Sequence, residues 1–301
     1  MMAAKNIHFI INPSAGKGKS PLTPEFLEQF FVRSLTQVTV KYSNYKKHAI
    51  ELTKESIAQG ADILVACGGD GTINEVASSL VGTSIPLGIV PIGSGNGLAS
   101  NLGISKNLRK ALTLLRNPHT TQIDVGCING KYFFSNTGLG FDAKVIKNYE
   151  SSHRRTLLGY LQACAMSFKK HDSIRNIAIK INDQDIRTDI FMVFVSNSNE
   201  MGYKLSLTPK ASLQDGFLDA LVISKIGRLK MLWLGILLLM NRPYLLKEAK
   251  SFRAQKIELF KDGKEILDSQ VDGELFSVGN RHISIGVMAH ALNVIAPPDF
   301  Q

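Results

Sequence analysis

The sequence is poor in cysteine and tryptophan. It has three cysteines and one tryptophan among 301 residues. Cys67, Cys127 and Cys164 lie far apart in the chain, each among apolar neighbours. This spacing excludes a disulfide framework and a clustered cysteine metal site, so we expect three buried, reduced thiols.

Membrane-spanning and signal-peptide features are also lacking. No apolar run approaches the roughly 18 to 20 residues that cross a bilayer. The first residues, MMAAKNIHFIINPSAG, lack the succession of basic, apolar and small-residue regions that marks a signal peptide. We therefore expect a cytoplasmic protein.

Acidic residues are fewer than basic ones. The sequence has 35 lysines and arginines against 25 aspartates and glutamates, a formal net charge of +10. Such a surface attracts polyanions, whether nucleic acid, an anionic membrane or a phosphorylated small molecule. Because no basic stripe is interleaved with aromatic residues, we expect no nucleic-acid partner.

The first 120 or so residues alternate strand-like and helix-like segments. The strand candidates DILVAC (62–67) and LGIVPI (87–92) are apolar at successive positions. That pattern is typical of a parallel sheet covered by helices on both faces. We therefore predict an α/β domain with a mostly parallel sheet over residues 1–122.

From about residue 122 the strand candidates alternate apolar and polar positions. Examples are RNIAIKIN (175–182), QKIELFKDG (255–263) and HISIGVM (282–288). This alternation predicts an antiparallel β-sandwich over residues 123–288, interrupted by two helical segments. The final residues, 289–301, are expected to return to the first domain.

A glycine-rich turn follows the first apolar run. The stretch NPSAGKGKS (12–20) ends like a Walker A loop, but that loop needs a glycine where this sequence has Pro13. Proline has no N–H to give a phosphate, so the stretch is not a Walker A loop. It remains a basic turn whose backbone N–H groups can bind phosphate oxygens.

The strongest signal is GGDGT at residues 68–72, between a buried strand and a helix. Its glycines let the backbone approach a phosphate, and the N–H groups of the following helix face the anion. A carboxylate at Asp70 would then hold Mg²⁺ or accept a proton from an attacking hydroxyl. The structural alternative is an aspartate that only caps the helix.

A third glycine-rich turn, residues 93–97, repeats this arrangement after another apolar strand. Ser94 could donate to a phosphate there, and Asn96 could cap the next helix. Because parallel strands bind ligands at their carboxyl ends, we expect the three turns to form one nucleotide site.

Together these motifs resemble the diacylglycerol kinase catalytic-domain family. Asn12-Pro13 with its turn, GGDGTINEV and PIGSGN occur in that family's order and spacing. The similarity continues in Ser43 with KHA, NTGLGFDA (136–143), SLQDGFLD (212–219) and VDGE (271–274). One departure is Gly97, where many members have an aspartate.

The resemblance implies a three-layer, NAD-kinase-like α/β domain and a lipid kinase that uses ATP and Mg²⁺ on a lipid such as diacylglycerol. It makes Glu274 and Asp70 the catalytic candidates. It implies a structural Mg²⁺ held by Ser212, Asp215 and Phe217, although QDGFLD also reads as a plain turn. The implied ATP contacts are Asn12, Pro13, Ser14, Ala15, Gly16, Ser43, Gly68, Gly69, Asp70, Gly71, Thr72, Ile73, Asn74 and Ser94.

Several alternatives stay open. GGDGT also occurs in NAD kinases, which phosphorylate a soluble nucleotide, and a non-catalytic nucleotide-binding protein would use the same turns. The lipid headgroup and the choice between monomer and homodimer are undecided. The apolar segment 228–242 is either a helix packed on the sandwich or an interfacial helix, and a lipid substrate would bring the protein transiently to the inner face of the membrane.

Overall fold

The computed structural model describes residues 5–16, 22–31, 35–93, 95–151, 157–169, 173–199, 206–261, 267–278 and 281–300. The chain divides into two compact units. Unit 1 contains Met1–Ile123 with His290–Gln301, and unit 2 contains Asp124–Ala289.

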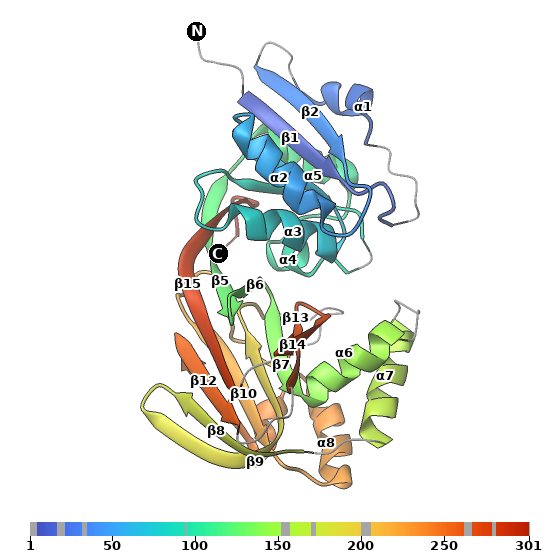
Figure 1. The fold of residues 1–301 in the computed structure, drawn as a ribbon. Coiled ribbons are helices and arrows are strands. Elements are labelled where there is room, and N and C mark those ends of the chain that lie inside the picture. Colours follow the sequence, from blue (N-terminus) through green and yellow to red (C-terminus); the bar gives the residue numbers. More distant parts are fainter. Residues whose placement is uncertain are drawn as a thin grey trace. The chain divides into compact units, whose positions relative to one another are not determined.

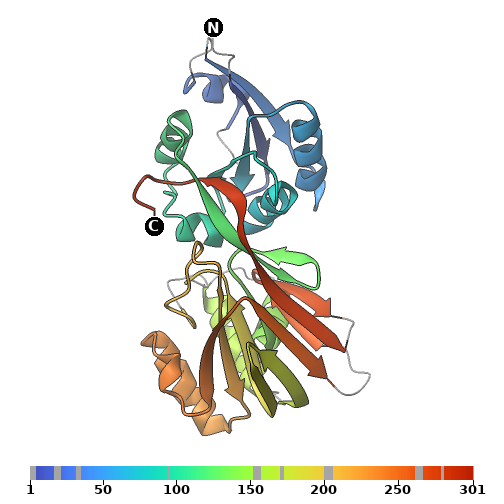
Figure 2. The ribbon, with the colours of Figure 1, turned by 90° about the vertical axis from the view of Figure 1, so that its left-hand side faces the viewer.

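Unit 1 is a three-layer α/β domain (Figures 1 and 2). Its parallel sheet has the order β15-β4-β3-β1-β2, and helices α2 and α3 lie on the opposite face from α5. The bounds are β1 (Lys5–Ile11), α1 (Pro24–Glu28), β2 (Thr36–Tyr42), α2 (His48–Ala58), β3 (Ile63–Gly68), α3 (Asp70–Leu80), β4 (Leu87–Pro91), α4 (Gly97–Asn101) and α5 (Leu108–Arg116).

The continuous apolar runs of the sequence form the central strands of this sheet. Every residue of β3 and of β4 is buried. Helices cover both faces of these strands, so no position along them faces water. The sheet is completed by the last part of β15 (His282–Ile295), where Val294 pairs with Leu87 in parallel.

Over its described residues, unit 2 is an antiparallel β-structure with three α-helices and one short 3₁₀ helix. Its strands follow the order β14-β13-β7-β9-β8-β12-β15, while β10 pairs with β9 and β11, and β5 pairs with β6 and β15. The bounds are β5 (Thr120–Ile128), β6 (Lys131–Phe133), β7 (Asn136–Gly140), α6 (Phe141–Ser151), α7 (Leu157–Lys169), β8 (Ile174–Ile181), β9 (Gln184–Ser196), β10 (Leu218–Ser224), α8 (Arg228–Leu239), η1 (Pro243–Leu245), β11 (Ala249–Ala254), β12 (Lys256–Lys261), β13 (Leu267–Val271) and β14 (Glu274–Val278).

Two apolar clusters hold unit 2 together. One lies among the strands and includes Ile179, Val193 and Ile285. The other joins Phe194 and Leu221 of the sheet to the buried side of α8. The alternating strands of the sequence therefore form an antiparallel sheet with one side in each cluster, as the predicted fold class requires.

The cysteines only partly match the prediction. All three are free thiols, but only Cys67 is fully buried, whereas Cys127 and Cys164 are partly exposed. Cys67 lies on a central strand, while the other two lie on β5 and α7, which each expose one side. Among the described residues, no helix has the length and apolar character needed to cross a bilayer.

Candidate active site

The three glycine-rich turns meet at one edge of the unit 1 sheet. The Asn12 N–H donates to the Cys67 carbonyl at 2.9 Å, and the Ile92 N–H donates to the Gly68 carbonyl at 2.9 Å. The turns follow β1, β3 and β4, which are parallel neighbours and so end at the same edge. The structure thus brings together the three turns that the sequence predicts to converge.

Their backbones touch so closely that side chains are excluded. A Cβ atom on Gly93 would lie 2.5 Å from the Gly69 Cα, far inside van der Waals contact. Gly16 has a φ of +68°, and a Cβ there would lie 2.8 Å from the Ile92 carbonyl oxygen. The glycines are therefore required by contacts among the turns themselves, whatever the turns bind.

The carboxylate of Asp70 joins the second turn to the third. Its two oxygens accept hydrogen bonds from the backbone N–H groups of Asn96, at 2.9 Å, and Gly97, at 2.5 Å. These N–H groups open α4, so Asp70 caps a helix, but not the helix on which it lies. Asn96 adopts a left-handed conformation with a φ of 62°. The sequence motif does not reveal this conformation, so it could not predict that Asp70 accepts these two N–H groups.

The first turn is tied to the second by Asn12 and Thr72. The Asn12 Nδ2 donates to Thr72 Oγ1 at 3.2 Å, while its Oδ1 accepts from the Ser14 N–H at 2.9 Å. Ser43 joins the group through its N–H, which donates to the Ile11 carbonyl at 2.9 Å. These hydrogen bonds bring four residues that the sequence predicts to contact the nucleotide to the same edge of the unit 1 sheet. They are Asn12, Ser14, Ser43 and Thr72.

The remaining predicted contacts differ in what they can offer. Pro13 and Gly71 are exposed, and Ala15 and Asn74 are half-buried. Ile73 is fully buried and its N–H donates to the Gly69 carbonyl, so it supports the turn from behind. Ser94 lies outside the described residues.

In unit 2, Glu274 follows a tight turn between β13 and β14. The turn residues Asp272 and Gly273 have φ values of 48° and 79°, as Asp-Gly does in a two-residue hairpin. The Asp272 carboxylate accepts hydrogen bonds from the N–H groups of Phe134, Ser135 and Asn136 at 2.8–3.0 Å. These hydrogen bonds fix the backbone that carries the exposed Glu274. The sequence prediction assigned no role to Asp272.

The buried side chain of Gln270 also stabilises the turn at Asp272 and Gly273. Its Oε1 accepts from the Gly273 N–H at 2.9 Å. Its Nε2 donates to Asn136 Oδ1 at 2.7 Å and to Asp142 Oδ2 at 2.8 Å. The motifs NTGLGFDA and VDGE, far apart in the sequence, are thus parts of one buried hydrogen-bond network.

Asp142 is the buried acid of this network. Burial raises the pKa of Asp142 to about 6, and the hydrogen bond from Gln270 opposes that shift. A Cβ on Gly138 would lie 2.0 Å from Asp142 Oδ2, so the carboxyl group fills the space left by that glycine. The acid is therefore held against the strand backbone rather than in water.

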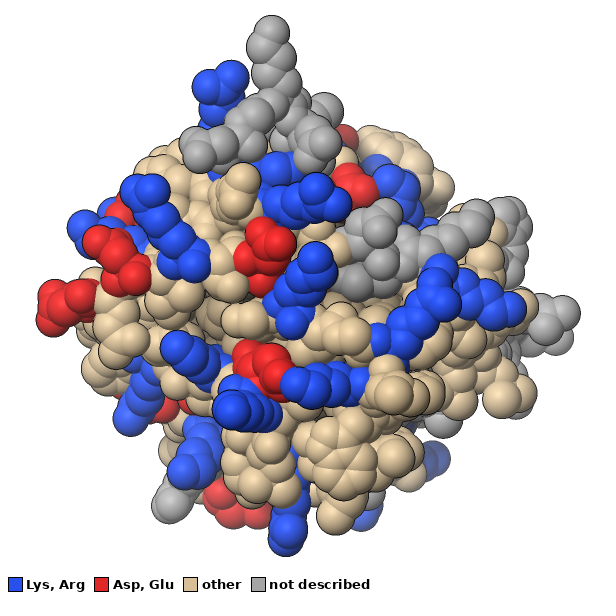
Figure 3. Space-filling view, turned by 90° about the horizontal axis from the view of Figure 1, so that it is seen from below, with Lys and Arg blue, Asp and Glu red and all other residues tan. Residues whose placement is uncertain are grey.

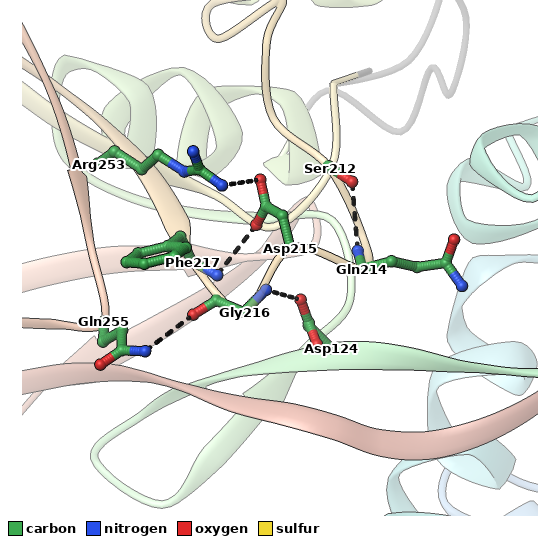
Figure 4. A network of polar contacts seen from close by, with 8 residues as sticks. All are labelled: Asp124, Ser212, Gln214, Asp215, Gly216, Phe217, Arg253 and Gln255. Atoms are coloured by element: carbon green, nitrogen blue, oxygen red, sulfur yellow. Dashed lines mark hydrogen bonds and ion pairs between the residues drawn. The ribbon is translucent and has the colours of Figure 1, made fainter. Parts of the chain in front are cut away.

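The predicted metal residues lie in one turn before β10 (Figure 4). Asp215 Oδ1 accepts from the Phe217 N–H at 3.0 Å, and Asp215 Oδ2 pairs with Arg253 at 2.8 Å. Gly216, with a φ of +72°, donates its N–H to Asp124 Oδ2 at 2.7 Å. Ser212 Oγ accepts from the Gln214 N–H at 3.3 Å.

This turn offers ligands that suit Mg²⁺, with one competitor. A carboxylate and backbone carbonyls are the hard oxygen donors that Mg²⁺ prefers. Arg253 already pairs with one oxygen of Asp215, so a divalent cation would share that oxygen or displace the guanidinium. In the described part of the chain, this turn included, no three His, Cys, Asp or Glu side chains gather as metal ligands. The metal assignment therefore stays a prediction.

Comparisons with known proteins agree with the division of the chain into two units. Residues 6–128 match the model of the diacylglycerol kinase catalytic domain, and residues 135–296 match that of the YegS C-terminal NAD kinase beta sandwich-like domain. The chain belongs to the diacylglycerol kinase family.

Two relatives are similar to this chain over most of its length. The chain is 28% identical over 237 residues to a diacylglycerol kinase of Bacillus subtilis, and the match covers 73% of this chain and 74% of the relative. It is 25% identical over 268 residues to a protein of Enterobacter sp. named probable lipid kinase YegS-like, covering 87% of each.

Solved structures show the same fold. A diacylglycerol kinase structure from Bacillus anthracis superposes with a TM-score of 0.73 at 19% identity over the full length of both chains. An NAD kinase of Archaeoglobus fulgidus, solved with ATP, gives 0.52 at 14% identity over 97% of this chain and 94% of that one. The predicted fold class, including its NAD-kinase-like character, is confirmed.

Proposed function

We propose that this member of the diacylglycerol kinase family is a lipid kinase that transfers the γ-phosphoryl group of ATP to the hydroxyl of a lipid such as diacylglycerol. The observation that carries the proposal is the convergence of three glycine-rich turns at one sheet edge. Turns packed backbone to backbone can present N–H groups to several phosphate oxygens at once.

The proposed nucleotide contacts divide by chemistry. The turn at Asn12–Gly16 and the turn at 68–74, with Ser43 and Ser94, would surround the phosphates and the nucleoside. Asp70 keeps the third turn in place through Asn96 and Gly97. Its carboxylate is thus committed to shaping the site, and we assign the proton transfer to Glu274.

In the proposed reaction the lipid oxygen bonds to the γ-phosphorus as the bond from that phosphorus to the β,γ-bridging oxygen breaks. Glu274 accepts the hydroxyl proton, and ADP leaves. An alcohol is too weak an acid to ionise at neutral pH, so the proton must pass to a base as the new bond forms. The three backbone N–H groups that donate to the Asp272 carboxylate fix the hairpin on which Glu274 lies.

Mg²⁺, when bound with ATP, would neutralise charge on the β- and γ-phosphate oxygens. Ser212, Asp215 and Phe217 would hold a separate, structural Mg²⁺ through the Asp215 carboxylate and the two backbone carbonyls. That ion would stabilise the turn before β10 and has no part in the proton transfer.

The test is phosphate transfer from γ-labelled ATP and Mg²⁺ to mixed micelles of diacylglycerol, monoacylglycerol, sphingosine or ceramide, with NAD in a parallel reaction. We expect label in the organic phase, and the micelle that becomes labelled identifies the headgroup. Label confined to the NAD reaction would replace this proposal with an NAD-kinase-like function. ATP binding without transfer to any acceptor would leave a nucleotide-binding protein.

Glu274→Gln tests the assigned base. We expect turnover to fall by roughly 10²- to 10⁴-fold with ATP affinity retained, because the amide cannot accept the proton. Asp183→Asn, on the exposed turn between β8 and β9, is the matched control and should keep wild-type turnover. Unchanged turnover in Glu274→Gln would refute the assignment.

A further inference from the structure

Helix α8 is apolar on two sides, and only one side is covered. Met231, Leu234 and Leu237 are buried in the cluster against the sheet. A second row recurs at helical spacing and stays in water. Its members, here called the α8 face, are Leu229, Leu232, Trp233, Ile236, Leu239 and Met240, with exposed fractions of 83%, 58%, 49%, 49%, 74% and 54%.

The apolar surface continues beyond the helix. Tyr244 and Leu245 of η1 are 54% and 55% exposed, and η1 packs against α8. Soluble monomers rarely leave more than a few hundred Å² of contiguous apolar surface exposed. The α8 face sets six large apolar side chains in one row, each about half or more exposed, and such a row is typical of a surface that binds a partner.

The surroundings of the α8 face are strongly basic. Between residues 225 and 250 there is one acidic residue, Glu248, which pairs with Lys230. Figure 3 views the molecule from the end where α8 lies and shows more lysine and arginine than acidic side chains. The basic residues of this stretch are Lys225, Arg228, Lys230, Arg242, Lys247 and Lys250.

This combination identifies the chemistry of the partner. Leucines beside a tryptophan and a tyrosine, all flanked by cations, are typical of helices that lie in the headgroup region of a membrane. A second copy of the chain fits poorly, since a two-fold contact would set the same basic border against itself. An anionic bilayer satisfies both the apolar row and the charge.

We propose that the α8 face docks on an anionic phospholipid membrane, with α8 lying parallel to the surface. The apolar row enters the boundary between headgroups and acyl chains, and the basic residues contact lipid phosphates. With 12 residues, the helix is too short to span a bilayer. The inference deepens the proposed function, since a lipid kinase must meet its substrate at a membrane, but it is tested without turnover.

The experiment is cosedimentation of the full chain with vesicles of phosphatidylcholine alone and with added phosphatidylglycerol. We expect wild-type binding to the anionic vesicles, and weaker binding as salt rises. Leu232→Gln should weaken binding roughly tenfold, because one leucine leaves the lipid. Its matched control is Leu35→Gln, which changes a leucine of unit 1 that is 61% exposed and should bind like wild type.

The charges are tested separately. Lys247→Gln and Lys250→Gln, both at exposed positions, should each weaken binding to anionic vesicles by roughly fivefold and leave the weak binding to phosphatidylcholine unchanged. Thermal unfolding shows whether each variant is folded, and these surface changes should leave Tm within a few degrees of wild type.

Three outcomes would overturn the inference. They are absence of wild-type binding to anionic vesicles, equal losses in Leu232→Gln and Leu35→Gln, and a dimer on gel filtration that Leu232→Gln dissociates. The last would make the α8 face a contact between copies. If vesicle binding depends on Leu232 while no lipid is phosphorylated, the docking surface stands and the proposed kinase activity fails.

Discussion

Asp70 and Gly97 belong to different glycine-rich turns, and the carboxylate of Asp70 accepts the Gly97 N–H at 2.5 Å. Its other oxygen accepts the N–H of Asn96. A carboxylate that accepts two backbone N–H groups is a strong restraint, so Asp70, the one acid of the GGDGT motif, sets the conformation of a loop 26 residues away. Asp70 therefore fixes the third glycine-rich turn relative to the second.

Asp70→Asn should destabilise unit 1 and weaken ATP binding together. The amide can accept one of the two hydrogen bonds but turns its NH₂ toward the other donor, which costs about 1–3 kcal/mol. Urea unfolding and ATP titration measure the two effects. Asp62→Asn, where the exposed carboxylate accepts the Asn6 N–H, is the control and should lose less. Loss of turnover with stability and ATP affinity intact would show a chemical role instead.

Gly93→Ala should abolish ATP binding by separating the second and third turns. Its Cβ would lie 2.5 Å from the Gly69 Cα, and backbone cannot move aside as a side chain can. Gly235→Ala is the control, since nothing lies within 4 Å of its Cβ on the exposed side of α8. That change should stabilise the protein by about 0.5–1 kcal/mol through helix propensity. Normal ATP affinity in Gly93→Ala would contradict the packing of the turns.

Asp142 should make the protein less stable as pH rises from about 4 to 6. The pKa of this buried acid is about 6 in the folded state against an ordinary 3.8, so the unfolded state releases its proton first. The loss is complete above pH 6 and amounts to about 3 kcal/mol by linkage.

Asp142→Asn removes this dependence while keeping an oxygen to accept the hydrogen bond from Gln270. Its stability should match that of wild type near pH 4 and exceed it at pH 7. Urea unfolding across pH 4 to 8 gives the comparison, with Asp183→Asn as an exposed control. Parallel curves for wild type and Asp142→Asn would show that Asp142 is not held in its protonated form.

The ion pair of Asp215 with Arg253 should compete with Mg²⁺. In Arg253→Met the carboxylate is released to the metal, so Mg²⁺ should raise Tm more than in wild type, by about 2–4 °C for each kcal/mol of added binding. Asp215→Asn should show no Mg²⁺-dependent rise. Arg187→Met, an exposed position on β9, should respond as wild type does. A rise in Tm that Asp215→Asn retains would move the metal elsewhere.

Much of unit 1 could be predicted because its signals are local. Buried parallel strands read as continuous apolar runs, and glycines mark where backbones touch, as Gly69 and Gly93 do. Partners fixed by distant pairing could not be predicted in this way. Arg253 reaches Asp215 because strand pairing sets it opposite Asp219, and no spacing in the sequence records that register.

Helix α8 shows a different limit. Its residues are apolar on almost every side, so the sequence predicts either a helix packed on the sandwich or an interfacial helix and does not decide between them. Met231 and Leu232 are neighbours of the same chemical type, yet one is buried and the other is 58% exposed. Only the position of the sheet decides which row is covered, and composition carries no information about that.

The strand β15 leaves unit 2 and completes the sheet of unit 1. Val294 pairs with Leu87, the Gly82 N–H donates to the Ala291 carbonyl, and the Ala296 N–H donates to the His119 carbonyl. On the ribosome, these residues emerge only after all of unit 2 has been made. The α/β fold of unit 1, although encoded first, therefore keeps an open sheet edge during synthesis. Its last strand is added only after the residues of the sandwich have been translated.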